Sequence, residues 1–209
     1  MQKLNKETRE LKKKDKVLGK IIQENLPKLS SRGTVYESLL SAIISQQIST
    51  SAATSVRNKF LKLFKGKYPA PLALQKAKAE KLKRAGLSRQ KIDYLKSVAT
   101  HFIVEKLDEK KFHKMTDKEV IEDLVKIKGV GSWTAEMVLI FSLLRKDVFS
   151  DKDLALMAPI FKLYRINKKK YTPKKLKAKI EKITQAWSPH RTLASRYLWQ
   201  YYGQMRAKR

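Results

Sequence analysis

The stretch LVKIKGVGSWTAEMVLIF, from Leu124 to Phe141, places two glycines around a valine and follows them with an almost uninterrupted apolar run. The pattern predicts a short helix, a tight turn at residues 128–132, and a second helix that is apolar on nearly every side. Glycine supports positive φ angles and leaves no side chain above the turn. Val130, between the glycines, is expected to point inward and fix the two helices together. The sequence therefore predicts a helical hairpin at residues 124–141.

The same turn is suited to holding an anion. Backbone N–H groups at the start of a helix point outward, where the helix dipole favours negative charge. Such a site can hold a DNA phosphate without reading base sequence. An ordinary helical hairpin closed by a glycine turn explains the pattern equally well. The candidate phosphate-binding residues are Lys128, Gly129, Val130, Gly131, Ser132 and Thr134.

The charge of the chain indicates a polyanionic partner. Among 209 residues, 48 are Lys or Arg and 19 are Asp or Glu, which gives a formal net charge of +29. This exceeds what solubility requires, and nucleic acid is the usual partner of so basic a protein. The alternative is a lysine-rich surface whose charge is only solvated. The length suits one large domain or two intimate lobes with a real core.

Several classes of protein are excluded by composition. Because cysteine is absent, the chain has no disulfide, no thiolate zinc site, no cysteine nucleophile and no cysteine-ligated iron–sulfur cluster. Three histidines are scattered without ligand spacing, so no metal site is expected. No apolar run approaches the roughly 20 residues of a membrane span, and no secretory signal is evident at the start. We therefore expect a cytoplasmic protein, associated with the nucleoid when bound to DNA, and no membrane partner.

The remaining pattern is helical. Residues 1–13 are polar and are expected to be a frayed basic segment, followed by one domain over residues 14–209. No period-2 strand is evident, so the predicted class is all-α. Apolar stripes predict helices near residues 36–44 and 88–102, and a further helix is expected at residues 49–64. Helix starts are expected at Ser88, at the Thr116–Glu119 capping box, at Thr172-Pro173 and at Ser188-Pro189.

Five segments in order resemble a known family. Ile127–Ala135 resembles the helix-hairpin-helix signature of the DNA glycosylase superfamily that carries a Gly/Pro-rich loop and a catalytic Asp (HhH-GPD). Four other segments are similar to the 3-methyladenine DNA glycosylase II branch, and the whole resemblance runs from about residue 36 to residue 203. It implies a two-lobed helical bundle with a DNA-binding cleft between the lobes. The four segments are Ser41–Ala53, Ala85–Leu95, Asp147–Leu156 and Trp187–Trp199.

The resemblance assigns the catalytic role to Asp153. A glycosylase builds positive charge on the sugar ring, which a carboxylate beneath the ring stabilises. Asp153 directly precedes the apolar run LALMAPIF and matches the family's catalytic Asp. From the residues alone, an N-cap is the commoner role for an Asp in this place. Asp147 and Asp151 are expected to be surface residues, and Arg191 is a candidate to support Asp153 through an ion pair.

The base pocket is expected to contain Trp133, Trp199 and Met137. Relatives that also nick the strand carry a lysine at the position of Trp133, as a Schiff-base nucleophile. Its absence here implies a monofunctional enzyme that leaves an abasic site. An indole also attracts a cationic alkylated base, although Trp133 could instead be a core residue. Trp199 lies off the packing stripe of its helix and aligns with a pocket tryptophan of relatives, and Met137 stands one turn after Trp133.

Gln47 is the candidate wedge. It follows the apolar stripe at the end of its helix and matches the intercalating position of the family, which fills the gap left by a flipped base. A helix-end amide that bonds a neighbouring backbone is the alternative. The hairpin carbonyls could hold a monovalent cation, as they do in relatives, but no required cofactor is implied.

The combined expectation is a monomeric, monofunctional glycosylase that acts on damaged double-stranded DNA. It hydrolyses the N-glycosidic bond of alkylated purines such as 3-methyladenine and 7-methylguanine, in base excision repair. Two alternatives stay open from the sequence. One is a glycosylase for a deaminated or oxidised base, and the other is a non-catalytic DNA-binding protein that keeps the hairpin and the charge.

Overall fold

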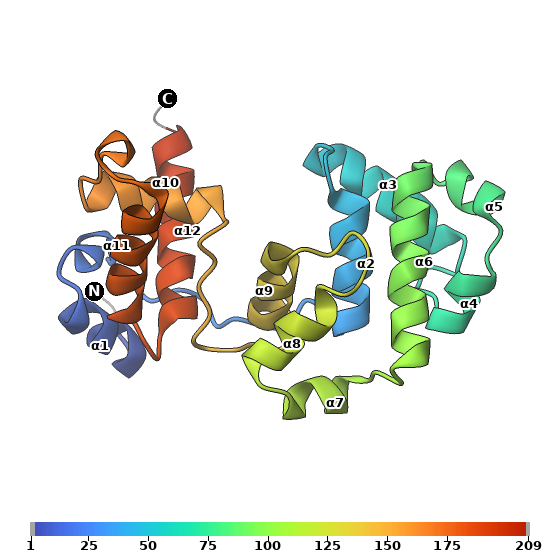
Figure 1. Ribbon diagram of the computed structural model, residues 1–209, viewed down its shortest axis with the longest axis horizontal. Coiled ribbons are helices and arrows are strands. Elements are labelled where there is room, and N and C mark those ends of the chain that lie inside the picture. Colours follow the sequence, from blue (N-terminus) through green and yellow to red (C-terminus); the bar gives the residue numbers. More distant parts are fainter. Residues whose placement is uncertain (1–2, 208–209) are drawn as a thin grey trace. The chain divides into compact units, whose positions relative to one another are not determined.

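The computed structural model describes residues 3–207, which form α-helices, two short 3₁₀-helices and no strand, so the all-α prediction is confirmed (Figure 1). None of the helices in this range is both long and apolar enough to cross a bilayer. The helices are α1 (Lys6–Lys14), η1 (Leu18–Ile21), α2 (Val35–Ser45), α3 (Thr50–Lys62), α4 (Pro71–Lys76), α5 (Ala79–Arg84), α6 (Arg89–Val104), α7 (Glu109–Lys114), α8 (Asp117–Leu124), α9 (Ser132–Phe141), α10 (Leu154–Leu163), η2 (Lys168–Lys170), α11 (Pro173–Gln185) and α12 (Arg191–Ala207).

The chain divides into two compact units. Unit 1 joins the two ends of the chain, Met1–Leu29 and Arg145–Arg209, whereas unit 2 is the continuous segment Ser30–Leu144. Unit 2 therefore contains helices α2 to α9, and unit 1 contains α1, η1 and α10 to α12.

The helices of unit 2 begin where their caps predict. Thr34 and Glu37 form a capping box at α2, and the hydroxyls of Ser49 and Ser88 accept N–H bonds at the starts of α3 and α6. The predicted capping box at Thr116 opens α8. These side chains satisfy N–H groups that a helix start otherwise leaves without partners. The predicted apolar stripe of α2 is buried in full: Tyr36, Leu39, Leu40, Ile43 and Ile44.

Helix α6 is the element against which most of unit 2 packs. Helices α2, α4 and α5 contact it, and α8 packs against α9. The rings of Tyr36 and Phe102 meet edge-to-face with centroids 5.0 Å apart, and Phe112 lies 5.7 Å beyond Phe102. His101 Nε2 lies 3.0 Å from Asp123 Oδ2, which ties α6 to α8. Because α6 contacts so many helices, a residue on it can hold several loops in place.

The prediction that residues 1–13 are frayed is wrong for residues 6–13, which are helical. Lys6–Lys14 form α1, in which Thr8 and Leu11 are both fully buried. Residues 1 and 2 lie outside the described range. The helix was missed because only two inward side chains, three positions apart, interrupt an otherwise charged sequence, which is too weak a stripe to stand out.

Ion pairs attach α1 to the C-terminal part of unit 1. Glu10 Oε2 lies 2.9 Å from His190 Nε2, and Lys146 Nζ lies 3.1 Å from Glu7 Oε1. The hydrogen bond from His190 lowers the pKa of Glu10. The N-terminal helix is therefore a structural part of unit 1.

The carboxylate of Asp15, the residue after α1, accepts four hydrogen bonds. Its Oδ1 accepts the N–H groups of Val17 and Leu18, each at 2.9 Å. Its Oδ2 accepts the indole N–H of Trp187 at 2.8 Å and the hydroxyl of Tyr164. Burial, followed by the bond to Asp15, raises the pKa of Tyr164. One carboxylate thus joins three separate segments of unit 1.

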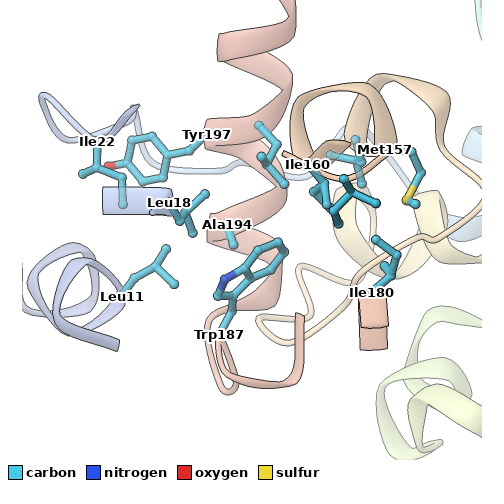
Figure 2. Packing of buried hydrophobic residues seen from close by; sticks show 12 residues of the cluster. Leu11, Leu18, Ile22, Met157, Ile160, Ile180, Trp187, Ala194 and Tyr197 are labelled. Atoms are coloured by element: carbon cyan, nitrogen blue, oxygen red, sulfur yellow. The ribbon is translucent and has the colours of Figure 1, made fainter. Parts of the chain in front are cut away.

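The core of unit 1 gathers around α12, where Ala194, Leu198 and Tyr197 meet side chains from α1, η1, α10 and α11 (Figure 2). Helix α12 begins at Arg191, so the predicted start at Ser188-Pro189 is wrong. The Ser188 hydroxyl donates to Asp147 Oδ2 at 2.7 Å instead of capping the helix. The predicted start of α11 at Thr172-Pro173 is confirmed.

Replacing Asp15 with Ala should destabilise unit 1. The change leaves the buried indole N–H of Trp187 and the half-buried hydroxyl of Tyr164 without their acceptor, at a cost of about 2 to 3 kcal/mol. The thermal midpoint should fall by roughly 5 to 10 °C for a protein of this size. Differential scanning calorimetry checks this, with the exposed Asp151→Ala as the control. Equal midpoints for the two variants would contradict a central role for Asp15.

Candidate functional site

The turn of the α8–α9 hairpin depends on Gly129. This residue has a φ of +89°, and a Cβ built on it would lie 2.3 Å from the ring of Tyr94 on α6. Lys128 N donates to Ser97 Oγ, also on α6, at 3.2 Å. Only glycine combines this backbone conformation with this close approach, so the prediction of a positive φ at the turn is confirmed at residue 129.

Gly131 has one of the two roles predicted for the glycines of the turn. Its φ of −98° is ordinary for any residue, so positive φ is not what it provides. A Cβ at this position would meet no atom within 4 Å, and Gly131 is the N-cap of α9. The start of α9 is therefore open above Gly131, which is the surface that an approaching anion needs.

The other predicted hairpin residues are partly accessible. Val130 is buried at 6% exposure, as predicted, and Thr134 is equally buried, so Thr134 is not open to an approaching phosphate. Lys128 is exposed and Ser132 is half-buried. The accessible set at the turn is thus Lys128, Gly131 and Ser132. Figure 1 shows the hairpin beside α2, which contacts α9.

Gln47 lies at the exposed turn that follows α2, in a conformation unusual for its type. Its φ is +55°, although it is not a glycine. The alternative role considered for it, an amide bonding a neighbouring backbone, belongs to Gln46. The Gln46 Nε2 donates to the carbonyl oxygen of Gly129 at 3.0 Å. Because Gln46 and Gln47 are adjacent and of the same type, the sequence does not indicate which of them makes this bond.

The predicted monovalent cation would need carbonyl oxygens of the hairpin turn. The oxygen of Gly129 accepts from Gln46, and that of Ile127 accepts from Val130 N at 3.0 Å. A carbonyl oxygen has two lone pairs, so each keeps one for an ion. These oxygens suit a hard cation, which stays a prediction.

In unit 1, Asp153 caps helix α10. Its Oδ1 accepts Ala155 N at 2.7 Å and Leu156 N at 3.2 Å. The side chain is held at a helix start and is 8% exposed. The N-cap role considered from the sequence is therefore present, and it fixes the carboxylate in one orientation.

The segment that leads to Asp153 is held by the first turn of α12. Thr192 Oγ1 donates to Arg145 O at 2.7 Å and accepts Val148 N at 3.1 Å. Arg191 makes a bidentate pair with Asp147, at 2.9 and 3.0 Å. Asp147, Arg191 and Thr192 together form a loop clamp.

The loop clamp corrects two predictions. Arg191 pairs with Asp147 and not with Asp153, and Asp147 is not a simple surface residue. Burial raises the pKa of Asp147, but hydrogen bonds from Arg191 and Ser188 outweigh it and hold the pKa below the ordinary value of an aspartate. The clamp is therefore intact at neutral pH and is lost only as the pH falls through that depressed value. Sequence alone did not indicate which of three nearby aspartates Arg191 would meet.

The predicted pocket residues differ in exposure. Trp133 is 44% exposed on α9, so the alternative of a core residue is wrong. Met137, one turn later, is half-buried. Trp199 is half-buried and packs against the core of unit 1. Trp133 and Met137 belong to unit 2 and Trp199 belongs to unit 1.

The family described as HhH-GPD superfamily base excision DNA repair protein matches residues 40–186. The chain is 37% identical to DNA-3-methyladenine glycosylase 1 of Schizosaccharomyces pombe over 166 residues, which cover 78% of this chain and 71% of that protein.

Two solved structures are similar as well. A DNA-3-methyladenine glycosidase from Bacillus halodurans matches with a TM-score of 0.83 and 32% identity. The match covers 97% of this chain and 92% of the Bacillus chain. The Schizosaccharomyces pombe 3-methyladenine DNA glycosylase in complex with abasic DNA matches with a TM-score of 0.77 and 33% identity. This match covers 94% of this chain and 96% of the yeast chain. With a match over most of its length and a hairpin and capping Asp in the expected places, the chain belongs to the HhH-GPD superfamily of base excision DNA repair proteins.

Proposed function

We propose that this protein is a monofunctional DNA glycosylase that removes alkylated purines, such as 3-methyladenine and 7-methylguanine, by hydrolysis. The observation that carries the proposal is Asp153, a carboxylate fixed at the start of α10 in a chain similar to glycosylases that are named for 3-methyladenine. The carboxylate stabilises the positive charge that develops on the sugar as the base departs. Water then completes the hydrolysis and leaves an abasic site.

DNA binding is supported by charge as well as by the hairpin. Unit 1 has 27 Lys and Arg against 8 Asp and Glu, so it carries +19 of the net +29. The hairpin turn of unit 2 adds outward-facing N–H groups at the N-terminus of α9. These features hold phosphates without regard to base sequence, as a repair enzyme that searches long stretches of DNA requires. The protein acts as a monomer on damaged double-stranded DNA.

The exposed indole of Trp133 supports both the substrate class and the mechanism. A base alkylated at N3 or N7 is cationic, and an indole ring attracts a cation stacked on it. Trp133 is 44% exposed. A tryptophan has no amine to form a Schiff base, so strand cleavage is not expected. We assign base-contacting roles to Met137 and Trp199, and we assign Gln47 to the wedge that replaces the extruded base.

Substitution of Asp153 by Asn should abolish base release and spare the fold. Asn caps a helix about as well as Asp, so stability should change by less than about 0.5 kcal/mol. Loss of the charge should slow the release of 3-methyladenine and 7-methylguanine from methylated duplex DNA by roughly a hundredfold or more under single-turnover conditions. Asp151→Asn, which removes an exposed charge two residues away, is the control. Equal release by the two variants would place the reaction at another residue.

Asp147→Asn should loosen the loop clamp without removing the reacting group. The bidentate ion pair with Arg191 is lost while the side-chain shape is kept. We expect single-turnover release to slow by roughly tenfold, because small misplacements of a catalytic group are costly. Affinity for undamaged duplex should match that of Asp151→Asn, which makes the same change in net charge. A rate equal to that of this control would refute the positioning role.

Gly131→Ala should weaken DNA binding with little effect on the fold. The new methyl group has open space and an ordinary φ, so folding should lose less than about 1 kcal/mol. The methyl would stand where a phosphate approaches the N–H groups of α9, and affinity for duplex DNA should fall by roughly tenfold. Fluorescence anisotropy over a salt series measures this. Gly203→Ala, which also has open space, is the control, and equal affinities would argue against the hairpin as a phosphate site.

A further inference from the structure

Gln46 connects two parts of unit 2 that have separate tasks in the proposed function. It is the C-cap of α2 and directly precedes Gln47, the candidate wedge. Its side-chain amide donates to Gly129 O at 3.0 Å, across 83 positions of sequence. Gly129 lies in the hairpin turn that is the candidate phosphate site. The side chain of Gln46 therefore bonds the phosphate-binding turn, and its backbone is joined directly to the wedge residue.

Helix α6 supports the same two parts from below. Lys91 Nζ donates to Ile44 O, in the last turn of α2, at 2.7 Å. One turn further along α6, the ring of Tyr94 lies against Gly129, and Ser97 accepts from Lys128 N. The end of α2 and the hairpin turn are thus anchored to one helix as well as to each other.

The conformation of Gln47 shows why such anchoring is needed. A φ of +55° is unfavourable for a residue with a Cβ, and glutamine has no short side chain to offset it. Such a conformation persists only where surrounding contacts determine it. On the α2 side, two contacts that join this turn to other helices are the Gln46 bond to Gly129 and the Lys91 bond to Ile44.

We propose that Gln46 is a positioning residue that fixes the wedge at a set distance from the phosphate-binding turn, so that gripping the backbone and entering the base stack occur as one rigid movement. The inference rests on the proposed function, since it takes the hairpin as the phosphate site and Gln47 as the wedge. Hydrogen bonds to phosphate carry no sequence information but set register on the duplex. Through Gln46, that register determines where Gln47 enters the stack.

The test separates wedge insertion from binding and from chemistry. Gln46→Met keeps the length of the side chain but removes its N–H donor without adding a charge, and Gln46→Ala removes the group altogether. The control is Gln75→Ala, an exposed glutamine of unit 2 whose amide donates to Thr100 Oγ1 at 2.9 Å, outside the hairpin and the wedge. The probe is a duplex with a tetrahydrofuran abasic analogue beside 2-aminopurine, whose fluorescence rises when its neighbour is unstacked.

Both Gln46 variants should bind undamaged duplex with the affinity and salt dependence of Gln75→Ala. At saturating protein, they should lose most of the 2-aminopurine signal, and base release in single turnover should fall roughly tenfold. An unchanged fluorescence signal would overturn the inference. If the Gln46 variants lost affinity for undamaged duplex and thermal stability to the same extent, the inference would also be overturned. Gln46 would then be a purely structural residue.

Failure of the proposed function gives a different result. A wild-type protein that releases no alkylated purine would contradict the glycosylase assignment, while the fluorescence of the abasic duplex would still report whether Gln46 governs insertion. If wild type raises no 2-aminopurine signal but does release base, the wedge assignment itself is wrong, and the inference falls with it.

Discussion

The contact between Gly129 and the ring of Tyr94 is the constraint on which the functional part of unit 2 depends. The α8–α9 turn can lie against α6 only because residue 129 has no side chain and tolerates positive φ. That contact sets where the carbonyl of Gly129 meets Gln46 and where the N–H groups of α9 emerge. Gly129 therefore acts through packing, whereas Gly131 acts by leaving the surface open. A Gly-Val-Gly motif does not distinguish these two roles by itself.

In Asp153, a structural bond and the proposed chemical role share one side chain. The N–H groups of α10 hold its Oδ1, so the carboxylate does not need to search among rotamers when DNA binds. The loop clamp then fixes the backbone that carries it, through Thr192 and the Asp147–Arg191 pair. A preorganised charge of this kind costs little reorganisation at the moment of reaction. The N-cap and catalytic interpretations of Asp153 are compatible, because the first prepares the second.

Much of the fold could be predicted from the sequence because local signals are strong there. Apolar stripes and cap residues located α2, α3, α6, α8 and α11, and the hairpin was found from its two glycines. Helix α1 escaped because so few of its side chains face inward. The partners of Arg191 and Gln46 lie 44 and 83 positions away, and several residues of the right chemistry compete for each. Spacing along the chain cannot rank such competitors, since only tertiary packing decides among them.

Unit 1 is built from both ends of the chain, and this fixes an order of events during synthesis. Glu10 meets His190 across 180 positions, so α1 is synthesised roughly 10 to 40 s before its partner. A nine-residue helix does not persist alone in water during that interval. Unit 2 is continuous, so all of its core residues are available for folding once Leu144 emerges. The nascent chain therefore carries a folded unit 2 with an unfolded N-terminal segment, and unit 1, with the aspartate proposed to be catalytic, forms only after α12 has been synthesised.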